Sequence, residues 1–157
     1  MANAYSSRTR WFALLLYADL TQSALACAAF FAGDVLRHHA WIAYLAALST
    51  LGPAILAILL IIRDKWESGV AMAALAMQSA VLITVFAAIY FAGGIHARPA
   101  GNVVADALYF SIVTWTTLGY GDVTPVPALR LLAALEALYG YVFLGLIVGL
   151  IGSRFRS

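Results

Sequence analysis

The sequence predicts an all-α membrane protein with four transmembrane helices, and with a re-entrant helix and a glycine-rich segment between the third and the fourth. Three observations predict this fold class. Of the 157 residues, 64% are hydrophobic and only 10% are charged, which is less charge than a soluble domain of this length carries. Four apolar stretches are long enough to cross a membrane, and one further apolar stretch is too short. The net charge of +2 supplies no basic surface for nucleic acid.

The four long apolar stretches are expected to be membrane-spanning helices. Roughly 20 apolar residues are needed, because a hydrocarbon core of about 30 Å is crossed at about 1.5 Å per residue. The predicted spans are residues 11–31, 40–62, 70–91 and 129–152. We therefore divide the chain into a two-helix region, residues 1–69, and a second region, residues 70–157.

The apolar segment at residues 105–116 is too short to cross a membrane. Asp106 near its start suits a helix N-terminus, and Gly119 and Gly121 follow its end. Irregular backbone at membrane depth is tolerated only where it is buried in protein or lines water. The segment is therefore predicted to be a re-entrant helix that leads into a water-lined loop.

The basic residues orient the chain in the membrane. Six of them fall on one side of the predicted spans: Arg8, Arg10, Arg63, Lys65, Arg154 and Arg156. Three fall on the other side: Arg37, Arg98 and Arg130. The excess places the N- and C-termini in the cytoplasm, and it puts Asp122 at the outer face. We expect a multi-pass protein of a cell membrane, with a bacterial inner membrane favoured by the compact chain.

Residues 117–121 have the composition needed to replace the water around a cation. Carbonyl groups point at one axis when alternate residues take left-handed dihedral angles, which glycine adopts without penalty. Gly119 and Gly121 flank Tyr120. The carbonyl oxygens of residues 117–120 and the Thr117 hydroxyl would then form stacked rings of cation ligands where four chains meet. Known potassium-selective filters are built in this way, and the likeness implies that the cation is K⁺. The predicted K⁺ ligands come from Thr117, Leu118, Gly119 and Tyr120.

This glycine-rich segment belongs to a longer motif, which reads DALYFSIVTWTTLGYGDVTP from Asp106 to Pro125. The motif resembles the pore loop of the tetrameric potassium channel family, and the resemblance covers roughly residues 70–151. It implies that the second region is a pore domain, with an outer helix at 70–91, a pore helix at 105–116, a selectivity filter at 117–121 and an inner helix at 129–152. Leu118 stands in place of the usual valine. Val113 stands where some bacterial members carry a glutamate paired to the filter aspartate.

Aromatic side chains are expected to hold the filter in shape. The Tyr120 ring is predicted to point away from the axis and to pack against Trp115 and Tyr109. Asp122 closes the filter at its outer end.

Glu136 lies within the predicted inner helix, where an ionisable group costs about 2.5–3.5 kcal/mol on insertion scales. It follows Arg130 by six residues, roughly 9 Å deeper along the helix. We predict that it faces Ser111, Thr114 or Thr116 from behind the filter and supports it. The alternative is a protonated acid that bridges subunits.

The resemblance places a gating hinge at Gly140 of the inner helix; a packing glycine is the alternative. If Gly140 is aligned correctly, three side chains at helical spacing face the cavity below the filter. They are Tyr141, Leu144 and Val148.

Other features leave the gating stimulus open. Asp19 in the first span is a proton sensor or, as we favour, a hydrogen-bonding link to the second span. Three histidines on the predicted outer side are pH or metal sensors or, as we favour, solvated loop residues: His38, His39 and His96. No span carries a basic residue at every third position, so a charged voltage-sensing helix is not expected.

Together these features predict a channel subunit that conducts K⁺ passively. One filter strand cannot encircle an ion, so a homotetramer in contact with membrane lipids is expected. No cofactor, nucleic-acid partner or enzymatic activity is predicted. The alternatives are a pore subunit of a potassium uptake transporter and a non-conducting or regulatory membrane subunit, and the single intact filter favours the channel over both.

Overall fold

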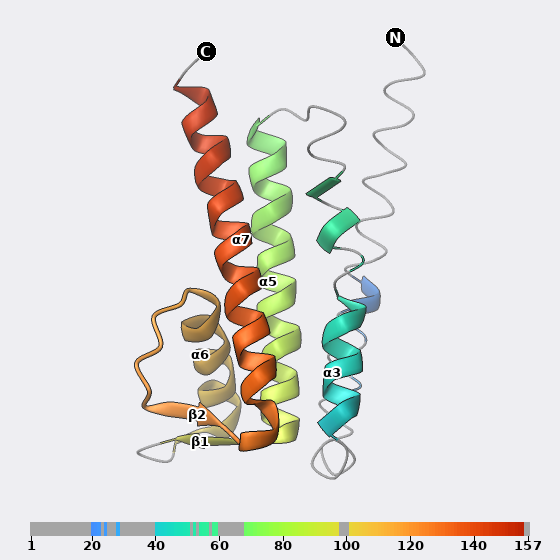
Figure 1. Cartoon of the computed structure of the whole chain (residues 1–157), viewed down its shortest axis with the longest axis vertical. Coiled ribbons are helices and arrows are strands. Elements are labelled where there is room, and N and C mark those ends of the chain that lie inside the picture. Colours follow the sequence, from blue (N-terminus) through green and yellow to red (C-terminus); the bar gives the residue numbers. More distant parts are fainter. Residues whose placement is uncertain are drawn as a thin grey trace.

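The structure, a computed structural model, describes residues 20–22, 24, 28, 40–50, 52, 54–56, 58–59, 68–97 and 101–155. This part of the chain is mostly helical (Figure 1). Its helices are α3 (Ala40–Ser49), α5 (Ser68–Gly93), α6 (Val103–Trp115), the short 3₁₀ helix η1 (Pro127–Leu129) and α7 (Arg130–Arg154). Its strands are β1 (Ile95–Ala97) and β2 (Val123–Pro125).

Two of the helices, α5 and α7, are long and apolar enough to cross a membrane, over Gly69–Gly93 and over Pro127–Gly152. They run antiparallel beside each other, and α6 lies beside them near the end where α5 finishes and α7 begins (Figure 1). These helices coincide with the predicted spans at 70–91 and 129–152. The first of them ends at a glycine pair, because Gly94 takes a φ of 110° and returns its N–H to the Tyr90 carbonyl at 2.9 Å.

The short helix α6 begins at an asparagine cap. The Asn102 side-chain oxygen accepts hydrogen bonds from the N–H groups of Val104 and Ala105, at 3.0 and 3.3 Å. The helix therefore starts at Val103, slightly before the predicted residue 105. With 13 residues it is too short to span a bilayer, as the sequence predicted.

A two-stranded antiparallel sheet joins the end of α5 to the segment that follows the glycine-rich run. Ile95 pairs with Pro125, and Ala97 pairs with Val123. The Val126 N–H adds a bond to the Gly94 carbonyl at 3.2 Å. The sheet was not predicted from the sequence, and it fixes the C-terminal end of the glycine-rich run to the end of α5.

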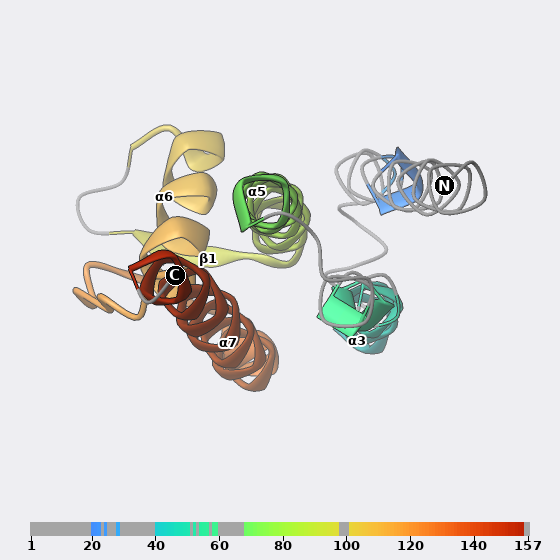
Figure 2. The same cartoon turned by 90° about the horizontal axis from the view of Figure 1, so that it is seen from above.

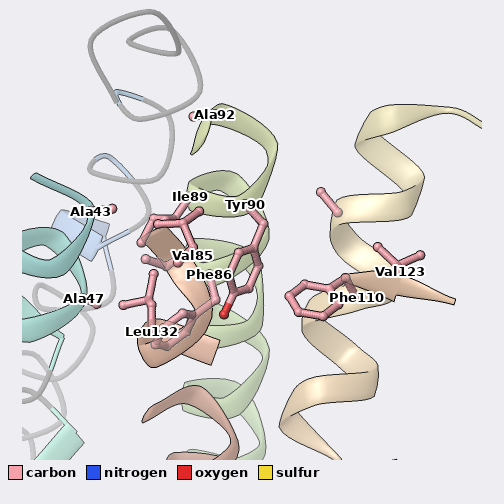
Figure 3. Packing of buried hydrophobic residues seen from close by; sticks show 12 residues of the cluster. Ala43, Ala47, Val85, Phe86, Ile89, Tyr90, Ala92, Phe110, Val123 and Leu132 are labelled. Atoms are coloured by element: carbon pink, nitrogen blue, oxygen red, sulfur yellow. The ribbon is translucent and has the colours of Figure 1, made fainter. Parts of the chain in front are cut away.

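The buried core brings α3, α5, α6 and α7 together, and Figure 3 shows most of its side chains. Tyr90 of α5 meets Phe110 of α6 edge-to-face, with ring centroids 4.7 Å apart and an interplanar angle of 77°. Ala43 and Ala47 of α3 are buried in the same cluster. Small residues let helix backbones approach closely, and this packing replaces the hydrophobic drive that lipid does not supply.

The two predicted N-terminal spans are described only in part. Helix α3 and the described residues after it lie within the predicted span 40–62, and Figure 2 shows α3 beside α5 and α7. Most of the predicted span 11–31 lies outside the described residues, including Asp19, and so do His38 and His39. The four-helix arrangement and the division at residue 69 stay predictions.

Candidate functional site

The glycine-rich segment has left-handed backbone at every second residue. The φ angles are 59° at Thr117, 55° at Gly119 and 81° at Gly121. The alternation of left-handed residues predicted from the two glycines is present. It begins two residues before Gly119, at Thr117. Because left-handed residues at alternate positions turn successive carbonyl groups toward one side, this backbone has the form that a row of ion ligands requires.

One side of the glycine-rich segment is open within the chain. Residues 117–122 are all exposed, and the side chains of Leu118 and Tyr120 are 58% and 68% exposed. A Cβ placed on Gly119 or Gly121 meets no atom within 4 Å. Within the chain, glycine is therefore needed there for its positive φ and not for lack of space.

Backbone hydrogen bonds fix the N-terminal end of the segment to the last turn of α6. The Thr117 N–H donates to the Thr114 carbonyl at 3.0 Å. The N–H groups of Leu118 and Gly119 both donate to the Val113 carbonyl, at 3.0 and 3.4 Å. Because these carbonyls belong to the end of α6, any movement of that helix moves the base of the segment.

A side-chain hydrogen bond fixes the C-terminal end of the segment, at Asp122. The Tyr109 hydroxyl donates to Oδ2 of Asp122 at 2.8 Å, and Asp122 Oδ1 accepts from the N–H of Val123 at 3.0 Å. The bond to the carboxylate raises the pKa of the Tyr109 phenol, so the hydroxyl keeps its proton at neutral pH. Thus a tyrosine partners Asp122 in a chain that has Val113 in place of a glutamate.

Within the single chain Trp115 packs on α7 and not on Tyr120, and its packing against Tyr120 in an assembled pore stays a prediction. Trp115 is 2% exposed and packs on Phe143 of α7, with ring centroids 5.6 Å apart. The reason is helical spacing, because Trp115 follows Ser111 by four residues and shares its face of α6. That face is turned to α7, while Tyr120 is left exposed.

Glu136 is fully buried behind α6, within the core of the domain. Its Oε1 lies 2.5 Å from Oγ of Ser111, and its Oε2 accepts a hydrogen bond from the Tyr90 hydroxyl at 2.7 Å. Of the three predicted partners, Ser111 is thus confirmed, whereas the Thr116 hydroxyl donates to the Ile112 carbonyl at 2.7 Å. Tyr90 was missed, because no spacing rule links residues 46 positions apart.

Gly140 lies directly against the end of α6. A Cβ built on it would overlap the carbonyl oxygen of Trp115, which is backbone and cannot give way. The structure thus gives Gly140 the packing role that was the alternative interpretation. Its use as a hinge stays a prediction.

The three predicted cavity side chains lie on α7 and are open within the chain. The exposed fractions are 74% for Tyr141, 40% for Leu144 and 66% for Val148. Their spacing of three and four residues places them along one face of the helix. That they line a cavity stays a prediction.

Comparison with known proteins identifies relatives of this chain. The model of a family described as "ion channel" matches residues 43–157. Two-pore potassium channel 5 of Arabidopsis thaliana is 43% identical over 35% of this chain and 13% of its own length. A candidate potassium channel protein of Rhodopseudomonas palustris is 31% identical over 55% of this chain and 21% of its own.

A shorter relative is Protein LctB of Geobacillus stearothermophilus, which is 48% identical over 31% of this chain and 39% of its own length. The chain thus spans much less than two thirds of each of these relatives. No solved structure matches it significantly.

Proposed function

Since this chain belongs to the ion channel family, we propose that it is a potassium-selective channel subunit that conducts K⁺ passively through a homotetrameric pore. The observation that carries the proposal is the alternating left-handed backbone at Thr117, Gly119 and Gly121. The names of two relatives, a two-pore potassium channel and a candidate potassium channel, support K⁺ as the ion.

Selectivity would arise from the backbone oxygens of the filter, residues 117–121. The carbonyl groups of residues 117–120 replace the water shell of K⁺, and the Thr117 hydroxyl completes the innermost ring. Helix α6 ends at Trp115, just before the filter, so the negative end of its dipole faces the ion path. No cofactor takes part, because the ion is itself the transported species.

Four copies are needed because one strand of carbonyls faces an ion from one side only. The open side of the filter and the exposed apolar side chains of α7 support this assembly. Closed cyclic symmetry is the ordinary way to surround an axis with identical chains. In this arrangement Tyr141, Leu144 and Val148 face the shared cavity, and membrane lipids cover the outer surface.

The orientation in the membrane follows from the distribution of basic residues. Both termini face the cytoplasm, and Asp122 at the end of the filter faces outward. Two membrane-length helices, α5 and α7, support a protein that spans a cell membrane. A bacterial inner membrane is the proposed location.

Ion flux from liposomes tests the proposed function. Purified protein is reconstituted in vesicles with an outward K⁺ gradient, and release is compared with that of vesicles loaded with Na⁺. We expect fast K⁺ release and slow Na⁺ release. Gly119→Ala should abolish K⁺ release, because a non-glycine residue at a left-handed φ costs about 1–2 kcal/mol in each copy. Equal release of the two ions, or none, would refute the proposal.

A further inference from the structure

A buried cluster of oxygen atoms joins three helices behind the filter. Tyr90 comes from α5, Ser111 from α6 and Glu136 from α7, and all three side chains are 0% exposed. The carboxyl group of Glu136 is central, with the Tyr90 hydroxyl 2.7 Å from one oxygen and the Ser111 hydroxyl 2.5 Å from the other. Figure 3 shows the Tyr90 ring between α5 and Phe110 of α6.

Ser111 has a second acceptor within reach. Its Oγ lies 2.9 Å from the carbonyl oxygen of Ile83 in α5. A serine hydroxyl carries one proton, a backbone carbonyl carries none, and an ionised carboxylate carries none. With Glu136 ionised, a single proton would face two acceptors, and one contact would be left without a hydrogen.

A proton on Glu136 satisfies every contact in the cluster. The acid then donates from Oε1 to Ser111, and Ser111 donates its own proton to the Ile83 carbonyl. The Tyr90 hydroxyl donates to the other carboxyl oxygen, Oε2. The contacts to Glu136 come from neutral hydroxyl groups, which suit a neutral acid better than a buried charge.

We propose that Glu136 works as a neutral acid whose hydrogen bonds with Tyr90, Ser111 and the Ile83 carbonyl hold the pore helix α6 in place, and that this position sets the selectivity of the filter. Glu136 and Tyr90 are thus positioning residues that act on the ion path through α6. The inference rests on the proposed function, and it goes beyond it by assigning a protonation state and a selectivity role to side chains that do not line the filter.

The path from the cluster to the filter is short. Ser111 lies two residues before Val113, whose carbonyl accepts the N–H groups of Leu118 and Gly119. The same turn of α6 ends at Trp115, whose carbonyl fits against Gly140 of α7. A shift of α6 away from α5 and α7 therefore displaces the carbonyl that anchors the base of the filter.

Three variants and a control test the positioning role by K⁺ and Na⁺ release from liposomes. Tyr90→Phe removes one hydrogen-bond donor with little change of shape. Glu136→Leu removes the carboxyl group at the centre of the cluster. Glu136→Gln keeps the network, since its carbonyl accepts from Tyr90 and its amide donates to Ser111. Ser79→Ala is the control, because the Ser79 hydroxyl donates to the Leu75 carbonyl of its own helix.

We expect Tyr90→Phe to lower the ratio of K⁺ to Na⁺ release by about fivefold, as the loss of one ordinary hydrogen bond would. Glu136→Leu should lower it further, while E136Q and Ser79→Ala keep the wild-type ratio. If Tyr90→Phe keeps the wild-type ratio, the positioning role is refuted. If E136Q loses as much selectivity as Glu136→Leu, the neutral-acid assignment is refuted.

Infrared spectroscopy measures the protonation state of Glu136 independently of conduction. The difference spectrum between the wild type and E136Q at neutral pH should contain the carbonyl band of a protonated carboxylic acid. A carboxylate band in its place would overturn the assignment. A wild-type protein that releases no K⁺ would refute the proposed function, whereas a selective wild type with an unaffected Tyr90→Phe variant would refute only this inference.

Discussion

At the scale of single residues, the structure separates glycines that need their backbone conformation from a glycine that needs its lack of a side chain. Gly119 and Gly121 have positive φ and open space around them. Gly140 has helical backbone and no room for a side chain, because a Cβ there would overlap the carbonyl oxygen of Trp115. Substitution by alanine should therefore act differently at the two kinds of position.

Gly140→Ala should destabilise the protein by about 1–3 kcal/mol, as overpacking against backbone does. Gly145→Ala is the matched control on the same helix, because its Cβ would meet no atom of the chain within 4 Å. Thermal unfolding of the two purified variants in detergent measures the difference. Equal melting temperatures would contradict the close contact between α6 and α7.

Tyr109→Phe should shorten the time for which the channel conducts, because Asp122 loses the hydrogen bond that ties it to α6. Macroscopic currents in planar bilayers measure this time course. Ser79→Ala, whose hydroxyl bonds within α5, is the control. A variant with wild-type kinetics would show that this bond does not hold the outer end of the filter.

The same bond predicts a dependence on pH. Since the bond to Asp122 raises the pKa of Tyr109 in the folded state, its stabilisation is complete below the ordinary tyrosine pKa of about 10. It is lost as the pH rises through the higher folded pKa. Alkaline solution on the filter side should therefore speed the decay of wild-type current and leave Tyr109→Phe unchanged. If alkaline solution instead speeds the decay of the Tyr109→Phe current and leaves the wild-type current unchanged, the assignment of Tyr109 as the donor is contradicted.

At the scale of elements, the stability of α6 depends on the residue that caps its N-terminus, Asn102. Asn102→Ala removes the side-chain oxygen that accepts two N–H groups, and it should cost about 1 kcal/mol. Asn102→Asp keeps an acceptor at the same place and is the matched control. Chemical unfolding in detergent, followed by helical circular dichroism, tests both variants. An unaffected alanine variant would show that the cap does not stabilise α6.

Long elements were predictable from the sequence, and contacts between distant elements were not. Apolar length alone located α5 and α7, and the short length of α6 marked it as unable to span. The pairing of β1 with β2 joins segments of only three residues each, which carry no usable periodicity.

The site was predictable to the same extent. Gly119 and Gly121 predicted the left-handed backbone of the segment, because a glycine's freedom to take a positive φ depends only on the residue itself. Tyr90 gave no signal, since its role depends on where two helices cross. The contact of Trp115 with Phe143 gave no sequence signal either, because the face of α6 that turns to α7 is decided by packing.

At the scale of the whole molecule, the described chain leaves apolar surface on the sides where other copies or lipid would lie. On α7 these residues include Leu131, Leu138, Tyr141 and Val148, which are 61–74% exposed. The filter is likewise open on one side. The proposed pore therefore needs more than one chain, and assembly into a ring is what the proposed function requires.

Chemical cross-linking in mild detergent should give a ladder that ends at four subunits. Denaturing the sample before adding the cross-linker is the control, because it removes contacts made only in the assembly. A ladder that ends at two subunits would leave the filter unable to surround an ion, and it would contradict the homotetramer.

The central claim is that the backbone at residues 117–121 selects K⁺, and the reversal potential tests it most directly. Wild-type protein is placed in a planar bilayer with K⁺ on one side and Na⁺ at the same concentration on the other. The account predicts a strongly shifted reversal potential, of the sign that K⁺ permeation alone produces. A reversal potential near zero would contradict it.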